Sequence, residues 1–164
     1  MDKMPLSRLI IVSLLLLVGA TAHAAPPMNT AALATIDRAT LDATQRGDIL
    51  SLEPYLAPNF QASIKVPTDQ GRFETLLFNR EEFLLYAWHA LSVAQDYQAR
   101  TQTADYKIAQ DGRSAVGQST LDESVRWQNQ SLRYTTQRTT HYRPGQNQIQ
   151  ITLLEVQVLK WDQP

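Results

Sequence analysis

The stretch YQARTQTADYKIAQDGRSAVGQSTLDESVRW, residues 97–127, decides the fold, because two long extended runs flank Asp111-Gly112. Asp-Gly between such runs is a strong signal for a β-hairpin, since a type I′ turn needs positive φ at both central residues. The register centred on this turn pairs Ile108 with Ala115, Tyr106 with Gly117, and Arg100 with Glu123. We therefore expect an antiparallel hairpin in which Arg100 and Glu123 form a cross-strand ion pair.

Two more extended runs follow, separated by turn residues at 128–130 and 144–147. With residues 97–127 they predict four consecutive strands in a meander. In the last run the apolar side chains change parity between Leu153 and Leu154. Because one extra residue in a strand re-aims every side chain beyond it, this switch predicts a β-bulge there. The alternative is a strand buried on both faces.

The chain before the hairpin has helical periodicity. Residues 29–46 repeat apolar and small side chains at spacings of three and four, with Asn29 or Thr30 as a possible cap and Gly47 as a stop. This pattern predicts an amphipathic helix. Asp48 is expected to cap a second, short helix.

Pro58 is expected to end that second helix, because its ring cannot continue the hydrogen-bond ladder. Residues 60–66 and 73–78 then predict two short strands. Asn79 stands where a helix cap belongs, with two glutamates in the first turn of a third helix. This helix is apolar on much of its circumference, so we expect it to lie between other layers.

The N-terminus has the three parts of a secretory signal peptide. Lys3 and Arg8 give a short charged start, and residues 9–18 form the apolar stretch that follows. Ala22-His23-Ala24 forms an A-x-A cleavage site. The apolar stretch is about half of the roughly 20 residues that a membrane-spanning helix needs. We expect residues 1–24 to be a signal peptide, 25–28 a linker and 29–162 a single domain, with a periplasmic or secreted mature protein and no stable membrane anchor.

Composition narrows the classes of partner. Removal of residues 1–24 takes away two of the 15 basic and one of the 16 acidic residues, which leaves a net charge of −2. A near-neutral chain without a Lys/Arg cluster argues against binding nucleic acid or an anionic membrane surface. The chain has no cysteine, so stability has to come from an apolar core.

Three short stretches carry a family resemblance: Arg46-Gly47-Asp48, residues 55–60 and residues 79–83. Together with the order of predicted elements they resemble the nuclear transport factor 2-like superfamily, also called ketosteroid-isomerase-like or SnoaL-like. The resemblance implies an α+β fold: a curved antiparallel sheet of about six strands wrapped around three helices from the N-terminal half, a cystatin-like cone. In that superfamily the open end of the cone is often a ligand pocket, and the outer sheet face often forms a homodimer.

The same resemblance directs attention to carboxylates inside the cone. Glu123 and Arg100 share the parity of the expected core face, so Glu123 is a candidate acid or base and Arg100 a charge stabiliser; the alternative is a salt bridge at the rim. Glu155, beside the expected bulge, is the other candidate acid or base. The alternative is that its carboxylate points outward, near Arg138. His141 is an alternative base or a surface imidazole.

Aromatic side chains supply candidate pocket walls. The candidates for lining an apolar pocket are Tyr86, Trp88, His89, Tyr106, Trp127 and Tyr134. Simple core packing is the alternative. The polar, β-branched residues expected on the opposite, outer face, where a homodimer would form, are Thr101, Thr103, Gln118, Thr120, Thr136, Arg138 and Thr140.

The residue inventory leaves three hypotheses for function. The mature chain has two histidines, neither with a second histidine at i+2 or i+4, and no nucleophile elbow, so we expect no metal, no cofactor and no hydrolase triad. The leading hypothesis is binding of a small, partly apolar molecule without catalysis. The others are a lyase or isomerase that uses a pocket carboxylate, and an envelope protein-interaction module.

Overall fold

The computed structural model describes residues 26–68, 72–127 and 130–162, so the predicted signal peptide lies outside the described residues. The elements are α2 (Thr30–Gln45), the 3-10 helix η2 (Ile49–Tyr55), β1 (Leu56–Pro67), β2 (Phe73–Asn79), α3 (Arg80–Val93), β3 (Gln95–Ile108), β4 (Ala115–Trp127), β5 (Gln130–Pro144) and β6 (Ile149–Asp162). This is the element order that the sequence predicts.

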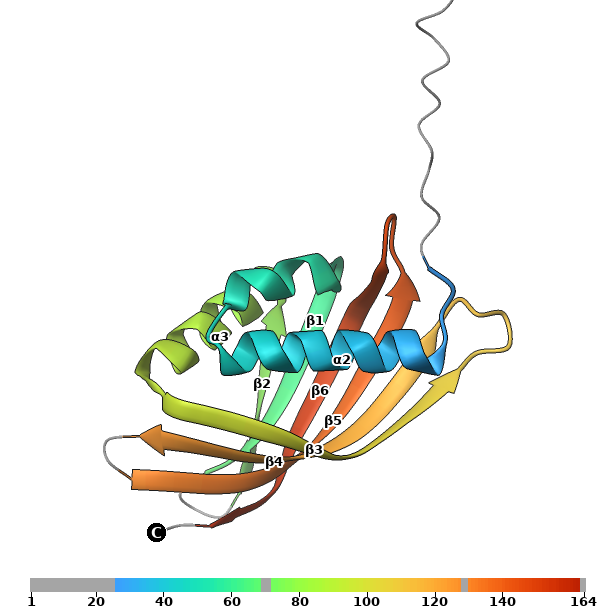
Figure 1. Ribbon diagram of the computed structural model, residues 1–164. Coiled ribbons are helices and arrows are strands. Elements are labelled where there is room, and N and C mark those ends of the chain that lie inside the picture. Colours follow the sequence, from blue (N-terminus) through green and yellow to red (C-terminus); the bar gives the residue numbers. More distant parts are fainter. Residues whose placement is uncertain (1–25, 69–71, 128–129, 163–164) are drawn as a thin grey trace, which may run out of the picture.

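The six strands form one sheet in the order β2-β1-β6-β5-β4-β3. Figure 1 shows that the sheet is strongly curved, that α2 crosses its concave face, and that η2 and α3 lie together at one end. The predicted α+β cone is confirmed. The sheet is mixed, because β1 pairs in parallel with β6 while all other neighbours are antiparallel.

Side-chain caps fix where the helices begin. The Asn29 side chain accepts a hydrogen bond from the Ala32 amide at 2.9 Å, and Asp48 caps η2. At α3, Asn79 and Glu82 form a complete capping box, in which each side chain accepts a hydrogen bond from the other's backbone amide. These caps satisfy amides that have no partner within the helix.

The second helix ends earlier than the sequence predicts. It is a 3-10 helix that contains Pro54, and the backbone is already extended at Leu56. Pro58 therefore lies within β1 instead of ending a helix, so that prediction is wrong. A proline within so short a helix already removes one amide donor, which favours an early exit into the strand.

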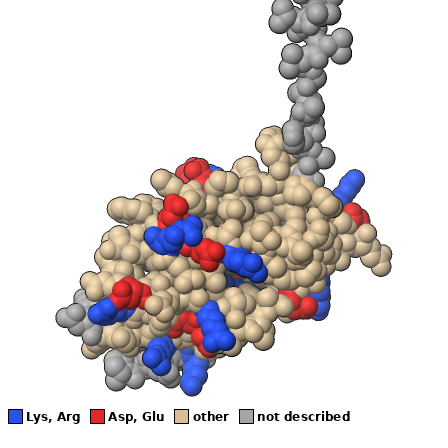
Figure 2. Space-filling model, in the orientation of Figure 1, with Lys and Arg blue, Asp and Glu red and all other residues tan. Residues whose placement is uncertain are grey.

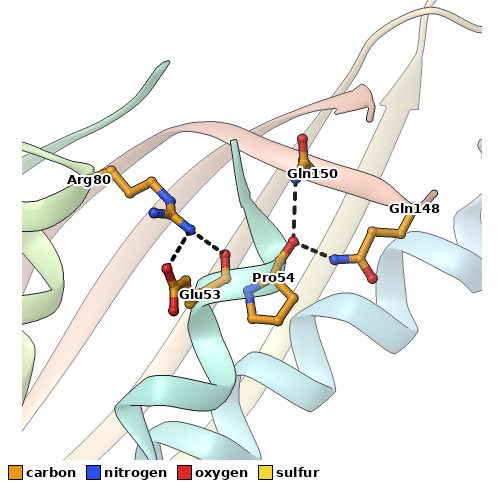
Figure 3. Close-up of polar contacts among 5 residues, drawn as sticks. All are labelled: Glu53, Pro54, Arg80, Gln148 and Gln150. Atoms are coloured by element: carbon orange, nitrogen blue, oxygen red, sulfur yellow. Dashed lines mark hydrogen bonds and ion pairs between the residues drawn. The ribbon is translucent and has the colours of Figure 1, made fainter. Parts of the chain in front are cut away.

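Contacts from η2 tie it to α3 and to β6 (Figure 3). Arg80 donates to the backbone carbonyl and the carboxylate of Glu53, both at 3.1 Å. The Pro54 carbonyl accepts hydrogen bonds from Gln148 and, at 3.4 Å, from Gln150. This clamp holds one end of the helical layer against the sheet.

The predicted hairpin register holds near the turn and fails farther out. Ile108 pairs with Ala115 and Tyr106 with Gly117, but the register shifts between Thr101 and Thr103. As a result Ala99 lies opposite Glu123, and Arg100 lies opposite Asp122. The predicted Arg100–Glu123 pair is wrong, because the irregularity at Gln102 turns Arg100 to the other face of the sheet.

The turn itself is not of the expected type. Gly112 has a φ of 66°, whereas Asp111 is absent from the positive-φ residues of the described chain. A type I′ turn needs positive φ at both positions, so the predicted turn type is wrong although the turn lies where expected. A hydrogen bond of 2.9 Å from the Ala109 amide to the Ser114 carbonyl closes a longer loop.

The parity switch in β6 comes from an irregularity one residue before the predicted place. His141 pairs with Leu153 but Tyr142 pairs with Ile151, which leaves Thr152 as the extra residue. The shift lets Ile151 and Leu154 both line the concave side of the sheet. The sequence-based prediction of a bulge is thereby confirmed.

The main core lies between α2, β1 and the neighbouring strands. Its buried members are Leu33, Ile36, Leu56, Phe60, Ala62, Ala115, Tyr142, Ile149 and Ile151. The third helix does not lie between layers as predicted: none of its residues is buried, and Leu85 and Trp88 are 66% and 59% exposed. Its Phe83, Leu84, Ala87 and Leu91 pack inward, so α3 covers one side of the core and presents its other face to solvent.

Candidate functional site

A cavity of about 300 Å³ lies between α2 and the concave face of the sheet. We call it the inner cavity. Its apolar wall contains Leu41, Leu52, Leu56, Phe60, Phe83, Leu121, Ile151 and Leu154. Its polar wall contains Asp37, Arg38, Thr101, Tyr106, Ser119, Arg138 and Thr140. An apolar enclosure with a few converging polar groups is the usual composition of a small-molecule site.

Asp37 enters the inner cavity from α2. Leu33 and Ile36, four and one residues earlier, are buried, so the same side of the helix faces the sheet. Two tyrosine hydroxyls donate to its carboxylate: Tyr106 to Oδ2 at 2.7 Å and Tyr142 to Oδ1 at 2.5 Å. One helix and two strands thus hold a single carboxyl group.

Gly117 makes room for the two tyrosine rings. It lies on β4 between Tyr106 of β3 and Thr140 of β5. A Cβ atom at this position would lie 3.0 Å from the Tyr106 ring and 3.1 Å from the Tyr142 ring. The missing side chain therefore allows both rings to pack over β4 and reach Asp37.

Burial changes the acid–base properties of this group. Loss of solvation raises the pKa of Asp37 above its ordinary value of 3.8, and it outweighs the lowering by hydrogen bonds from Tyr142 and Tyr106 and by the charge of Arg138. Burial and the Asp37 carboxylate raise the pKa values of Tyr106 and Tyr142, so both hydroxyls keep their protons and act as donors. A raised pKa at a cavity wall makes Asp37 a candidate for acid–base chemistry.

A second polar cluster stands on the sheet. Glu123 is buried, and its carboxylate accepts hydrogen bonds from the Tyr97 hydroxyl at 2.5 Å, from the Thr136 hydroxyl and from Arg138 Nη2 at 3.1 Å. Burial is the largest single influence and lowers the pKa of Arg138, but Glu123 and Tyr97 together outweigh it, so the pKa is raised. The guanidinium is thus permanently charged, and it lines the inner cavity.

The structure separates the predicted catalytic candidates. Glu123 lies on the concave face as expected, but its partner is Arg138 and not Arg100, which is exposed. Glu155 and His141 lie on the convex face, 3.8 Å apart and with half-exposed side chains. None of the four candidates, Glu123 included, is among the residues that line the inner cavity, so their catalytic roles stay predictions that the position of the cavity does not favour.

The aromatic candidates divide in the same way. Tyr106 lines the inner cavity. Tyr86, Trp88 and His89 instead line an open groove beside β2, and Tyr134 lines a polar depression on β4–β6. These four residues therefore lie apart from the inner cavity, while the side chain of Trp127 lies outside the described part of the chain.

Three charged residues, Asp37, Arg38 and Arg138, line the inner cavity, and the sequence analysis assigned none of them to it. Asp37 stands four residues after Leu33 and four before Leu41, so an acid within an apolar helical stripe was the available signal. Arg138 was predicted on the outer face with Thr136 and Thr140. That assignment is wrong, because these three residues lie on the concave face of β5.

Three further observations concern possible metal sites, membrane-spanning helices and surface charge. Within residues 26–68, 72–127 and 130–162, no group of three or more His, Asp or Glu side chains is placed to hold a metal ion, and no helix is long and apolar enough to cross a membrane. On the face shown in Figure 2, basic and acidic side chains lie close to one another, without a large area of one sign.

Neither a protein-family model nor a curated protein sequence matches the chain. Solved structures do. A nuclear transport factor 2-like protein from Cytophaga hutchinsonii is 16% identical, with a TM-score of 0.62 over 80% of this chain and 100% of that one. The chain has the nuclear transport factor 2-like fold. 

Two more structures share this nuclear transport factor 2-like fold. An uncharacterized protein with a cystatin-like fold from Caulobacter vibrioides is 12% identical, with a TM-score of 0.63 over 80% of this chain and 89% of that one. Hexachlorocyclohexane dehydrochlorinase LinA-type3 from Novosphingobium barchaimii LL02 is 11% identical, with a TM-score of 0.65 over 80% of this chain and 87% of that one. Such a fold hosts many functions, so function has to be argued from the site.

Proposed function

We propose that the protein binds a small, partly apolar molecule in the inner cavity. The observation that carries this proposal is an open space of about 300 Å³ with an apolar wall on one side and Asp37 and Arg138 on the other. A cone filled by its own side chains would instead favour a purely structural or interaction role. The volume stands at the small end of the range for ligand pockets, roughly 300–1,000 Å³, so the ligand is compact, of the size of a single substituted ring.

A cavity-filling variant tests the proposal. Ala104 lines the inner cavity from β3 yet is exposed, so Ala104→Trp can fill the space with little strain on the core. Ala109→Trp, at an exposed position just beyond the same strand, is the matched control. Ligand-observed NMR with acetophenone, benzoate and ethylbenzene measures binding to each variant, and native mass spectrometry of protein purified from its own cells reports any retained molecule.

The expected result is binding of at least one probe to the wild type and to Ala109→Trp, and its loss in Ala104→Trp. Equal binding to both variants would place the ligand elsewhere on the protein. Absence of any bound probe or retained molecule in the wild type would overturn the proposal.

A second candidate function, proton transfer in a lyase or isomerase, is favoured by Asp37. Its carboxylate would take a proton from a carbon of the bound molecule, and the C–H electron pair would form a new double bond as a leaving group departs from the next carbon or as charge moves to a carbonyl oxygen. The raised pKa of Asp37 suits such a step, since a carboxylate matched more closely to neutral pH is a better base. The dehydrochlorinase among the structural neighbours, by its name, catalyses an elimination of this kind.

Deuterium exchange tests this second function. Acetophenone is incubated with protein in D₂O, and NMR follows the exchange of its methyl protons. Asp37→Asn should abolish any exchange that the wild type accelerates, whereas Asp42→Asn, at an exposed position on the same helix, should not. If the wild type binds acetophenone without accelerating the exchange, Asp37 does not take a proton from this ligand, and binding alone remains the proposed function.

We also propose that the protein acts after export, as a periplasmic or secreted protein. The support is the sequence of residues 1–24, with its basic start, apolar stretch and A-x-A site. N-terminal sequencing of the protein from fractionated cells should give Ala25 as the first residue. Recovery of the intact chain from the cytosol would contradict export. The homodimer through the convex sheet face stays a prediction, which the same native mass spectra address.

A further inference from the structure

We propose that Arg138 selects the ligand, which carries an acceptor oxygen, of a carbonyl or a carboxylate, on its apolar body. The proposal rests on ligand binding in the inner cavity and adds the chemical class of the ligand. Its basis is the way in which Glu123 and Arg138 are arranged across β4 and β5.

The buried Glu123 carboxylate holds the Arg138 guanidinium in position. The Glu123 side chain is 4% exposed and bonds Arg138 Nη2 at 3.1 Å, whereas the Arg138 side chain remains 23% exposed and lines the inner cavity. The carboxylate is therefore hidden and the guanidinium borders the space that a ligand would fill. Tyr97 and Thr136 also donate to Glu123, which fixes the position of the carboxylate. Glu123 is thus a positioning residue for Arg138.

The guanidinium has donors left for a ligand. Arginine carries five N–H donors and no acceptor, and one of its nitrogens, Nη2, is bound to Glu123. Its Nε is buried and has no hydrogen-bond partner within the described residues, so the protein itself does not complete the hydrogen bonding of this group. The N–H groups in the exposed part of the Arg138 side chain can therefore bind only a ligand atom that accepts a hydrogen bond.

The two tyrosines beside Asp37 do not compete with Arg138 for an oxygen of the ligand. The hydroxyl protons of Tyr106 and Tyr142 are already donated to Asp37, so these tyrosines offer a ligand no free proton. Arg138 is close enough to Asp37 for its charge to lower the pKa of that carboxyl. Because Arg138 and Asp37 line the same cavity, an oxygen held by Arg138 would share that space with Asp37, and the ligand's apolar body would lie against Phe60, Phe83 and the aliphatic wall.

Three matched probes test the inference. Acetophenone carries a carbonyl, benzoate a carboxylate, and ethylbenzene neither, on the same ring. Dissociation constants are measured by ligand-observed NMR for the wild type, for Arg138→Lys, which keeps a cationic donor, and for the double variant Arg138→Met/Glu123→Gln. The double variant removes both charges, because Arg138→Met alone would leave a buried carboxylate without its cation.

We expect acetophenone or benzoate to bind the wild type about tenfold more tightly than ethylbenzene, as one hydrogen bond to a charged donor allows. The oxygen-bearing probe that binds more tightly identifies the acceptor as carbonyl or carboxylate. The preference should disappear in Arg138→Met/Glu123→Gln and survive in part in Arg138→Lys, while ethylbenzene affinity stays within about twofold, as apolar contacts are kept.

Two results would overturn the inference: equal affinity of the wild type for all three probes, or an oxygen preference that persists in the double variant. If no probe binds the wild type, the failure lies with the inner cavity as a binding site, and both proposals fall together. Unchanged ethylbenzene binding in the double variant shows that the cavity has kept its shape, so a lost preference then reports on Arg138 alone.

Discussion

Glu123→Gln should destabilise the fold strongly, because the Glu123 carboxylate is the centre of a buried polar cluster. It accepts hydrogen bonds from Tyr97, Thr136 and Arg138, and its side chain is 4% exposed. Removing one partner of a buried ion pair costs about 3–5 kcal/mol. Arg138 is 23% exposed and can be solvated in part, so we expect the low end, about 3 kcal/mol of unfolding free energy.

A double-mutant cycle isolates the pair. Arg138→Met should cost a similar amount, about 3 kcal/mol, because it leaves the Glu123 carboxylate buried without its cation. The double variant Arg138→Met/Glu123→Gln should lose far less than the sum of the two, since no unpaired charge remains. The expected coupling free energy is at least about 2 kcal/mol, measured by urea unfolding of the wild type and the three variants.

An exposed pair supplies the control. Arg126 and Asp96 form an ion pair with side chains 50% and 58% exposed, so the cycle Arg126→Met, Asp96→Asn should give a coupling below about 1 kcal/mol. Strictly additive losses for Glu123 and Arg138 would refute the reasoning, because they would mean that each residue stabilises the fold without the other.

Three further predictions follow from local structure. The pKa of Asp37 in the folded protein is raised above 3.8, so protonated Asp37 favours folding more than ionised Asp37 does. Its contribution to the free energy of unfolding is complete below pH 3.8 and is lost as the pH rises through the folded-state pKa. Asp37→Asn should therefore gain stability relative to the wild type across that window in urea unfolding, and a difference independent of pH would contradict the assignment. Gly117→Ala brings a Cβ to 3.0 Å from the Tyr106 ring, so thermal unfolding should show a loss of about 1–3 kcal/mol, and an unchanged midpoint would argue against close packing there. Asn79→Ala removes a helix cap and should cost about 1 kcal/mol in the same assay, whereas the exposed Asn59→Ala should change stability by less than about 0.5 kcal/mol.

Local rules predicted most of the fold. Asn29 and Asn79 cap helices where the sequence places them, because cap chemistry depends on a few neighbouring residues. The parity switch near Leu153 predicted an irregularity within one residue, since the side-chain period of a strand is two. Arg100 was assigned to the wrong face for the same reason. A single extra residue at Gln102 reverses every assignment beyond it, and nothing in a Thr- and Gln-rich run marks that residue.

The candidate site was predictable only in part. Glu123 was correctly placed on the concave face, but its partner Arg138 comes from the neighbouring strand. The register between β4 and β5 cannot be predicted from the sequence of either strand alone. Arg138 was assigned to the outer face and Asp37 was not singled out, because charged residues are expected at the surface unless paired. Their partners, two tyrosines and a glutamate, are distant in sequence and become neighbours only through the sheet.

The position of β6 in the sheet has a consequence for how the chain is made. This C-terminal strand lies between β1 and β5, so until it is in place the sheet is divided into a β2-β1 pair and a β5-β4-β3 group. Translation from the N-terminus delivers β6 last, and pairing it with β1 joins segments nearly a hundred residues apart, Leu56 with Ile151 among them. Non-local pairing of this kind is slow. A newly made chain therefore stays without its finished sheet until β6 has been synthesised, whereas its two halves can already pair within themselves.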